Sequence, residues 1–175
     1  MNYINDIKLQ NFDQSFNMIV EIPSGTKNKY ELIDSTFEDV KIVRKIKYKY
    51  PFQYGCFTQT YAGDKDPLDA ILLTNVKRKC LDIVKVQPIG VIKTIDNNEI
   101  DDKIFVIDIL EPLRNIEKLK KKAIKFLKKY KGKHSNTIVD ETFYDMEEAI
   151  KLINESHNAY KSKNTNKIND LKIIL

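Results

Sequence analysis

Residues 82–95, which read DIVKVQPIGVIKTI, decide the fold of this chain. Apolar and β-branched residues recur through the stretch, as they do in a long β-strand. Pro88 and Gly90 interrupt it, and such residues inside a strand mark a bend or a bulge. A small barrel needs a strand that turns a corner in this way, so the stretch predicts a curved sheet.

The first 110 residues contain further stretches with strand character, separated by turn residues such as Pro23 and Gly25. The segment 50–55, which reads YPFQYG, is aromatic and rich in turn-forming residues, so we interpret it as a turn. The stretches that we predict as strands are 16–23, 29–33, 40–46, 68–73 and 103–110.

The last third of the chain changes to a helical period. Apolar residues step by three and four from Ile116 to Tyr130, which predicts a helix ending near Gly132, and a second such pattern runs from Met146 to Tyr160. From Lys161 onward the chain reads KSKNTNKIND, and this polar stretch predicts a mobile tail over 161–175, unless the apolar LKIIL at its end docks on another part of the protein. With no repeat or linker in the chain, we expect one α+β domain over 1–175, a barrel of strands flanked by C-terminal α-helices.

Composition and charge fit a globular protein that works in water. The 175 residues are 42% hydrophobic and 31% charged, and the net charge is +5. No window approaches the ~20 apolar residues of a membrane span, and the start lacks the apolar core of a signal peptide. Cys56 and Cys80 form no CxxC pair, which is typical of a reducing compartment. We therefore expect a cytoplasmic protein with no membrane partner.

Three carboxylates lie within six residues at 64–69, which read DKDPLD. Acids this close repel one another unless positive charge lies among them, and oxygen-only ligands suit a hard cation such as Mg²⁺. An EF-hand is excluded because that loop needs Gly and Glu where this chain has Asp69 and Asn75. Taken alone, the stretch fits either a metal site or a solvated loop.

A second acidic loop at 96–103, which reads DNNEIDDK, lies between two strong strand signals and would connect them at one rim of the sheet. Because Asp and Asn favour turns, this loop by itself also fits a solvated turn. Lysine, arginine and tyrosine side chains are the donors that phosphate sites use. Candidate donors along the chain are Lys29, Arg44, Tyr54, Lys103, Tyr130 and Lys131.

In this order the motifs resemble those of the soluble family I inorganic pyrophosphatases, from about Ile19 to Lys131. The family signature has the form Asp-x-Asp-Pro-hydrophobic-Asp-hydrophobic, and DKDPLDA at 64–70 is similar to it. The other matching positions are Glu21 in VEIP, Lys29 and Glu31 in KYE, Arg44, Tyr54 and Gly55 in QYG, Asp96, Asp101 and Lys103 in the acidic loop, and the pair Tyr130 and Lys131.

The resemblance implies a five-stranded, OB-like barrel and the hydrolysis of inorganic pyrophosphate to two phosphates by a metal-activated water. It implies several Mg²⁺ ions in each active site, with Mn²⁺ or Zn²⁺ as substitutes. Asp66 would be the catalytic residue, which orients or deprotonates that water. The implied metal positions are Asp64, Asp69, Asp96, Asp101, Glu21 and Glu31, and the implied substrate-binding positions are Lys29, Arg44, Tyr54, Lys103, Tyr130 and Lys131.

Two features depart from the family pattern. The second signature position is usually small or polar, often Gly, whereas this chain has Lys65. If the backbone there has a positive φ, a lysine costs about 1–2 kcal/mol. The region after Lys131 is shorter than in bacterial relatives and lacks their tryptophans, which bears on the subunit interface. The resemblance implies a homo-oligomer, a hexamer as in bacterial members or a dimer as in eukaryotic ones.

The strongest alternative is an OB-like barrel that binds single-stranded nucleic acid. Aromatic residues between Tyr50 and Tyr61 and a lysine-rich helix after residue 117 are also ingredients of such proteins. Against it, the acidic loops would repel phosphates, and the lysines lie opposite a clean apolar stripe, as on a solvated helix face. A homologue without turnover is a third possibility, but the full set of acids and donors argues against it. We expect no nucleic-acid partner.

Overall fold

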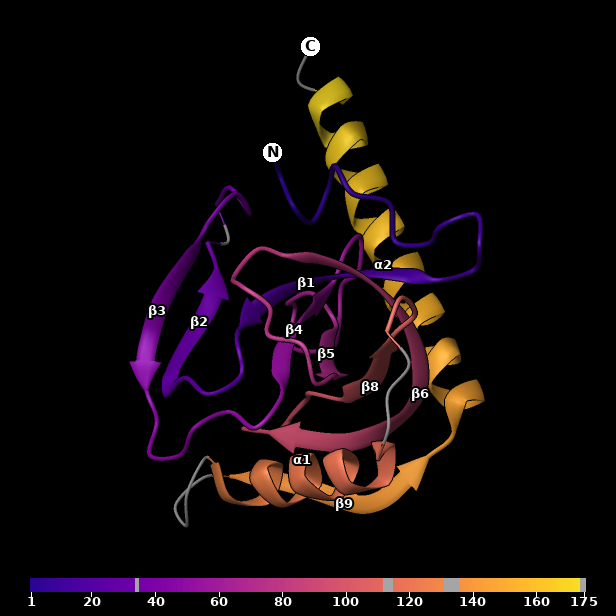
Figure 1. Ribbon diagram of the computed structural model, residues 1–175. Coiled ribbons are helices and arrows are strands. Elements are labelled where there is room, and N and C mark those ends of the chain that lie inside the picture. Colours follow the sequence, from indigo (N-terminus) through magenta and orange to yellow (C-terminus); the bar gives the residue numbers. More distant parts are fainter. Residues whose placement is uncertain (34, 112–114, 131–135, 174–175) are drawn as a thin grey trace.

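The computed structural model describes residues 1–33, 35–111, 115–130 and 136–173. Its strands close a five-stranded barrel, in which each strand pairs with the next and the last pairs back to the first (Figure 1). The predicted α+β class and five-stranded OB-like barrel are therefore confirmed. The barrel strands, in spatial order, are β1 (Phe16–Ile22), β4 (Gln53–Phe57), β5 (Asp69–Leu73), β8 (Lys103–Asp108) and β6 (Ile83–Asp96).

The bend predicted in the longest strand is present in β6. Its register against β8 shifts between Pro88 and Gly90, as a bulge requires. Gly90 is also a point of close approach, because a Cβ atom there would lie 2.3 Å from the ring of Phe143 and from the carbonyl oxygen of Tyr144. Only a glycine lets the chain segment that carries Phe143 pack against the outside of the barrel at this point.

The segment interpreted as a turn at 50–55 is the main correction to the predicted strands. Residues 53–57 form β4, a fully buried strand between β1 and β5. Gly55 permits this arrangement, because a Cβ atom there would lie 1.8 Å from the carbonyl oxygen of Ile19. The turn interpretation was wrong because Gly55 serves close packing of two strands, which a local pattern does not reveal.

Further strands extend or flank the barrel. β2 (Asn28–Leu32) and β3 (Val40–Lys45) form a separate two-stranded sheet that stands beside it (Figure 1). β7 (Glu99–Ile100) folds back on the end of β6, and β9 (Thr137–Tyr144) pairs with the same strand. The sequence analysis did not predict β9, which lies between the two helices.

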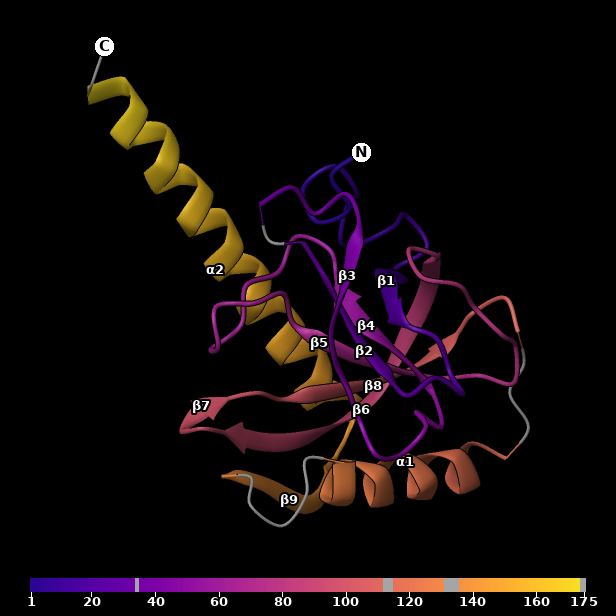
Figure 2. The ribbon, with the colours of Figure 1, turned by 90° about the vertical axis from the view of Figure 1, so that its left-hand side faces the viewer.

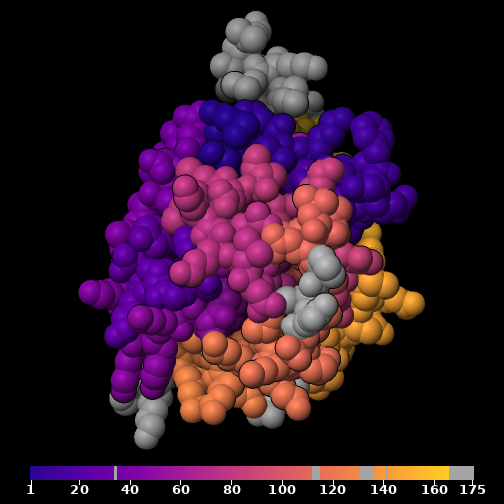
Figure 3. Space-filling view, in the orientation of Figure 1, coloured from indigo at the N-terminus to yellow at the C-terminus, as the bar shows by residue number. Residues whose placement is uncertain are grey.

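Both predicted helices are present. α1 (Ile116–Tyr130) buries Ala123, Phe126 and Leu127 against the barrel. Most of its lysines are exposed on the opposite side, as its apolar stripe predicted, whereas Lys120 lies over the ring of Phe143. In Figure 3, α1 (orange) covers the lower end of the molecule next to the purple β2–β3 sheet. In the described part of the chain, no helix is long and apolar enough to cross a membrane.

α2 (Met146–Ile173) begins where the sequence predicted and packs Ala149 and Ile153 into the core. Its backbone continues as helix through most of the stretch that we predicted as a tail, and Figure 2 shows this half leading away from the barrel.

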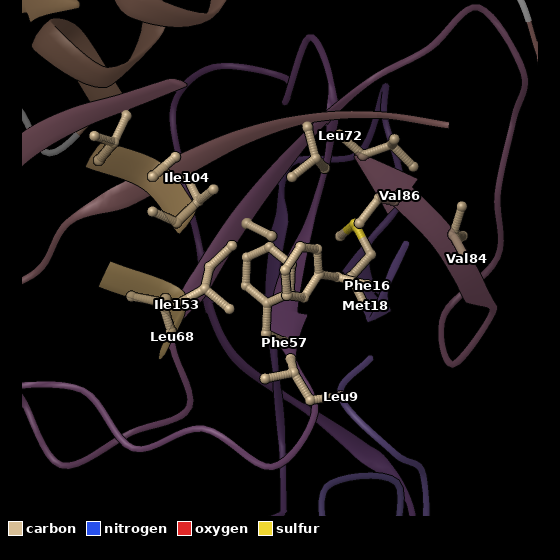
Figure 4. Packing of buried hydrophobic residues seen from close by; sticks show 14 of the residues in the cluster. Leu9, Phe16, Met18, Phe57, Leu68, Leu72, Val84, Val86, Ile104 and Ile153 are labelled. Atoms are coloured by element: carbon tan, nitrogen blue, oxygen red, sulfur yellow. The ribbon is translucent and has the colours of Figure 1, made fainter. Parts of the chain in front are cut away.

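The barrel is filled by apolar side chains from its strands and from α2. Phe16, Met18, Phe57 and Leu72 point toward one another, and Ile153 of α2 joins them (Figure 4). A second buried cluster lies beneath α1 and combines aliphatic side chains with several aromatic rings. In it the ring of Phe126 lies 5.0 Å from that of Tyr50, between centroids, and 5.3 Å from that of Tyr130. This cluster fixes the end of α1 beside one end of the barrel.

Candidate active site

A pocket of about 230 Å³ lies at one end of the barrel, where β5 and β8 begin. These two strands run parallel, so Asp69 and Lys103, their first residues, are neighbours. The two acidic segments, far apart in sequence, meet at this pocket. The predicted site residues that line it are Glu21, Lys29, Glu31, Tyr54, Asp64, Asp66, Asp69, Asp96, Asp101, Lys103 and Tyr130.

Two predicted substrate-binding residues are not among those lining the pocket. Arg44 lies on the exposed strand β3, where it is the cross-strand partner of Lys29. Burial raises the pKa of Tyr130, and the positive charge of Arg44 lowers it. Arg44 therefore lies near enough to Tyr130 to influence the ionisation of its hydroxyl. Lys131 lies outside the described residues.

The centre of the pocket is a buried lysine between two carboxylates. The ammonium of Lys103 donates hydrogen bonds to Asp69 and Asp101, and the hydroxyl of Tyr54 donates to the same Asp69 oxygen as Lys103 does. Burial disfavours the charge on Asp69, but Lys103 and the two hydrogen bonds outweigh it and hold the pKa of Asp69 below its usual value. The outcome for Asp101 is opposite, since burial and the charge of Asp69 raise its pKa to about 7.

Other acids around this centre are also hard to ionise. Burial, with repulsion from Asp69 and Glu31, raises the pKa of Glu21 to about 8, although its carboxylate accepts a 2.8 Å hydrogen bond from the amide of Leu32. Burial likewise raises the pKa of Asp64. Raised pKa values in a group of neighbouring acids mean that ionising them together costs free energy, which added positive charge would offset.

The donor set fits hard divalent cations. Its acids offer carboxylate oxygens, the ligands that Mg²⁺ and similar ions prefer. Within the described residues no three acidic, histidine or cysteine side chains already surround a single point as a metal cage, and the ammonium of Lys103 lies between Asp69 and Asp101. When a divalent cation binds, Asp69 and Asp101 would therefore turn some of their oxygens from Lys103 to the cation.

The loop that carries the signature contains a strained residue. Lys65 has φ +71°, in the left-handed region that favours glycine. Hydrogen bonds hold the turn closed, since the amide of Lys65 donates to the carbonyl of Ala62 over 3.1 Å and the amide of Asp66 donates to Asp64 Oδ1 over 3.1 Å. The positive φ considered for this position is therefore present, and Lys65 carries its cost.

Residues that the motifs did not single out also belong to the site. Glu99 and Asn97 line the pocket from the turn between β6 and β7, and Cys56 lines it from β4. Thr137 of β9 donates a 2.6 Å hydrogen bond to Asp96 Oδ1. Thr137 belongs to a strand that the sequence did not predict, so its contact with the acidic loop became visible only in the folded chain.

A closed barrel with a pocket of clustered acids, a buried lysine and two phenols at one end fits the class of metal-dependent hydrolases of phosphate compounds. The sequence model of a family described as inorganic pyrophosphatase matches residues 18–161. The chain therefore belongs to the inorganic pyrophosphatase family, and it is a hydrolase that acts on inorganic pyrophosphate. Nothing in these comparisons favours a nucleic-acid-binding barrel.

Individual relatives agree with the family assignment. The chain is 36% identical to an inorganic pyrophosphatase of Picrophilus torridus over 98 residues, which span 55% of each chain. It is 32% identical to soluble inorganic pyrophosphatase 2 of Chlamydomonas reinhardtii over 82% of this chain and 79% of that protein. The crystal structure of type I inorganic pyrophosphatase from P falciparum superposes with a TM-score of 0.86 at 24% identity, covering 98% of this chain and 68% of that one, and shows the same fold.

Proposed function

We propose that pyrophosphate is hydrolysed in this pocket with Mg²⁺ ions bound by Asp64, Asp69, Asp96 and Asp101. Glu21 and Glu31 would bind the same ions through water molecules. The observation that carries the proposal is the meeting of residues 64–69 and 96–101 around Lys103 in one pocket. When bound, divalent ions acidify a water molecule and neutralise charge on the substrate. Oxygen ligands favour Mg²⁺, and Mn²⁺ or Zn²⁺ would be substitutes.

Asp66 is the proposed catalytic residue. It is exposed and lines the pocket, so it can accept the proton of the attacking water and pass it to solvent. Its backbone is held in the tight loop by the hydrogen bond from its amide to Asp64. This arrangement directs a base at the pocket without burying it.

The cations and phenols are the proposed substrate-binding groups. Lys103 and Tyr54 line the pocket and donate to Asp69. Their donors would bind phosphate oxygens when a cation takes the place of these contacts at Asp69. Lys29 donates to Glu31 on the same strand, and Tyr130 lines the pocket from the end of α1. Arg44 and Lys131 complete the proposed set. Such donors stabilise the charge on the transferred and leaving phosphates.

The nucleic-acid alternative is weakened by where the aromatic side chains lie. Tyr50, Phe52 and Phe57 are at most 4% exposed, so their rings are not available for stacking on bases. Phe52 packs against Phe126 of α1, with ring centroids 5.3 Å apart. Most of the aromatic run that suggested a stacking surface is therefore core, and Tyr61 at its end is half-buried.

We further propose a homo-oligomer, a hexamer or a dimer, in the cytoplasm. Cys56 and Cys80 are free thiols, which supports a reducing compartment.

One assay tests the proposed function. We expect phosphate release from pyrophosphate in the presence of Mg²⁺, no release with excess EDTA, and little or no release when ATP replaces pyrophosphate. Release that persists in EDTA would contradict metal dependence. No release with any divalent ion, together with a salt-dependent shift of single-stranded nucleic acid in EDTA, would support the binding alternative instead.

A further inference from the structure

β9 lies outside the barrel, yet it contacts the acidic loop of the pocket. Thr137, its first residue, is the cross-strand partner of Asp96, and its hydroxyl donates a 2.6 Å hydrogen bond to Asp96 Oδ1. We propose that Thr137 is a positioning residue, which orients the carboxylate of Asp96 for divalent cations. This inference rests on the proposed function, because it takes Asp96 to be a metal ligand.

The strand that carries Thr137 is firmly attached to the barrel. β9 pairs with β6 at residues 91–92 and 94–96, and it includes the direct pair Ile95 with Ile138. At the far end of β9, Phe143 packs edge-on against the buried Phe105, with ring centroids 5.4 Å apart, and passes close over Gly90. The hydroxyl of Thr137 is thus held by a strand anchored in the core rather than by a free loop.

The carboxylate of Asp96 lies where such support matters. β6 ends at Asp96, and the chain then turns back through Asn97 and Asn98, which both have positive φ. A carboxylate at a strand end can adopt several rotamers, and fixing one of them before a cation arrives lowers the entropy cost of binding. The hydrogen bond from Thr137 constrains that rotamer.

The other end of the same loop has a comparable support. The hydroxyl of Thr94 donates to the carbonyl of Asp101, and the amide of Thr94 donates to Asp102 Oδ1 over 3.0 Å. Thr94 is buried and acts on the backbone, so it fixes where the loop runs. Thr137 acts on a side chain of the pocket itself, and its effect should therefore appear in cation binding more than in folding.

The test compares variants of β9 in the substrate-free full-length protein. Thr137→Val removes the hydroxyl at nearly constant size, and Thr137→Ser retains it. Thr142→Val is the matched control, because it makes the same change at an exposed position of β9. Thr142 lies near Asp140, and neither residue lines the pocket. Mn²⁺ binding is measured by electron paramagnetic resonance and calorimetry. We expect about 10-fold weaker binding for Thr137→Val, since residues that support metal ligands typically contribute about 10–100-fold. Thr137→Ser and Thr142→Val should bind Mn²⁺ with nearly the affinity of the unchanged protein.

A double-mutant cycle separates this inference from the proposed function. If Asp96 is the group that Thr137 acts through, Thr137→Val should produce no further loss in an Asp96→Asn background. Weaker Mn²⁺ binding in Asp96→Asn together with unchanged binding in Thr137→Val would overturn the role of Thr137 and leave the proposed function intact. Unchanged binding in Asp96→Asn would instead remove Asp96 from the proposed ligands. A fall in melting temperature for Thr137→Val without a change in Mn²⁺ affinity would make Thr137 merely structural.

Discussion

The two ends of the barrel each hold a positively charged side chain against carboxylates, and they differ in what surrounds that contact. Because β5 and β8 run parallel, their first residues lie at the pocket and their last residues at the opposite end. At the pocket, Lys103 contacts Asp69 and Asp101. At the opposite end, Arg78 contacts the buried Asp108, the last residue of β8, and lies 3.6 Å from Glu111.

The surroundings decide what each cluster can do. At the end with Arg78, local hydrogen bonds support the acids, since Asp108 accepts one from the amide of Leu110 over 2.9 Å. At the pocket, Glu21 and Asp64 add carboxylates whose pKa values burial raises. A buried ion pair therefore does not identify a functional site. A surplus of acids that are costly to ionise, placed around a pocket, does point to one.

The largest expected effect concerns the pocket. Asp66→Asn should lower kcat by roughly 10²–10⁴-fold, the usual contribution of a general base, because the amide cannot accept the proton of the attacking water. Steady-state phosphate release measures this effect. Since Asp66 is exposed, the free energy of unfolding of the variant protein should differ little from that of the unchanged protein, and urea denaturation measures it. Near-normal turnover in this variant would remove Asp66 from the catalytic role.

The opposite end of the barrel should show the reverse behaviour. Asp108→Asn removes the buried partner of Arg78, and we expect a loss of about 2–3 kcal/mol in the free energy of unfolding. The expected loss is small for a broken buried ion pair, because Arg78 is partly exposed and still has Glu111 nearby. For protein that remains folded, kcat should stay within about twofold. A large loss of kcat without a loss of stability would erase the contrast between the two ends.

A smaller effect should appear in the pH dependence of stability. The folded protein holds the proton of Glu21 up to about pH 8, whereas the unfolded chain releases it near pH 4.5. Between these pH values the folded state binds more protons, so the free energy of unfolding should fall as pH rises. Glu21→Gln should reduce this fall by at most about 1.4 kcal/mol for each pH unit. The comparison is denaturation in EDTA at pH 6 and pH 8, and equal slopes for the two proteins would contradict the raised pKa.

The smallest expected effect concerns the loop at Lys65. Lys65→Gly relieves a left-handed conformation that costs about 1–2 kcal/mol, but glycine adds about 0.5–1 kcal/mol of chain entropy to be lost on folding. The net gain should be about 0.5–1 kcal/mol in the free energy of unfolding. Lys65→Ala keeps the Cβ atom and serves as the matched control, with little gain. Equal gains in both variants would show that charge, rather than backbone strain, governs this position.

Local patterns in the sequence were sufficient for much of the fold. Pro88 and Gly90 marked the bulge in β6, and the spacing of apolar residues marked α1 from Ile116 to Tyr130, because strand and helix periods are properties of neighbouring residues. β4 and β9 were missed for a tertiary reason. Gly55 is required by the backbone of β1, and β9 is ordered by pairing with β6, and neither partner is close in sequence.

The same division holds for the site. The types and order of the acids, lysines and tyrosines were present in the sequence, and they were enough to indicate oxygen ligands for cations and donors for phosphate. Only the folded chain decided that Lys103 lies between Asp69 and Asp101, that burial raises the pKa of Glu21, and that Thr137 contacts Asp96. The reason is physical, since burial and distance set ionisation and hydrogen bonding, and both arise only when distant segments pack together.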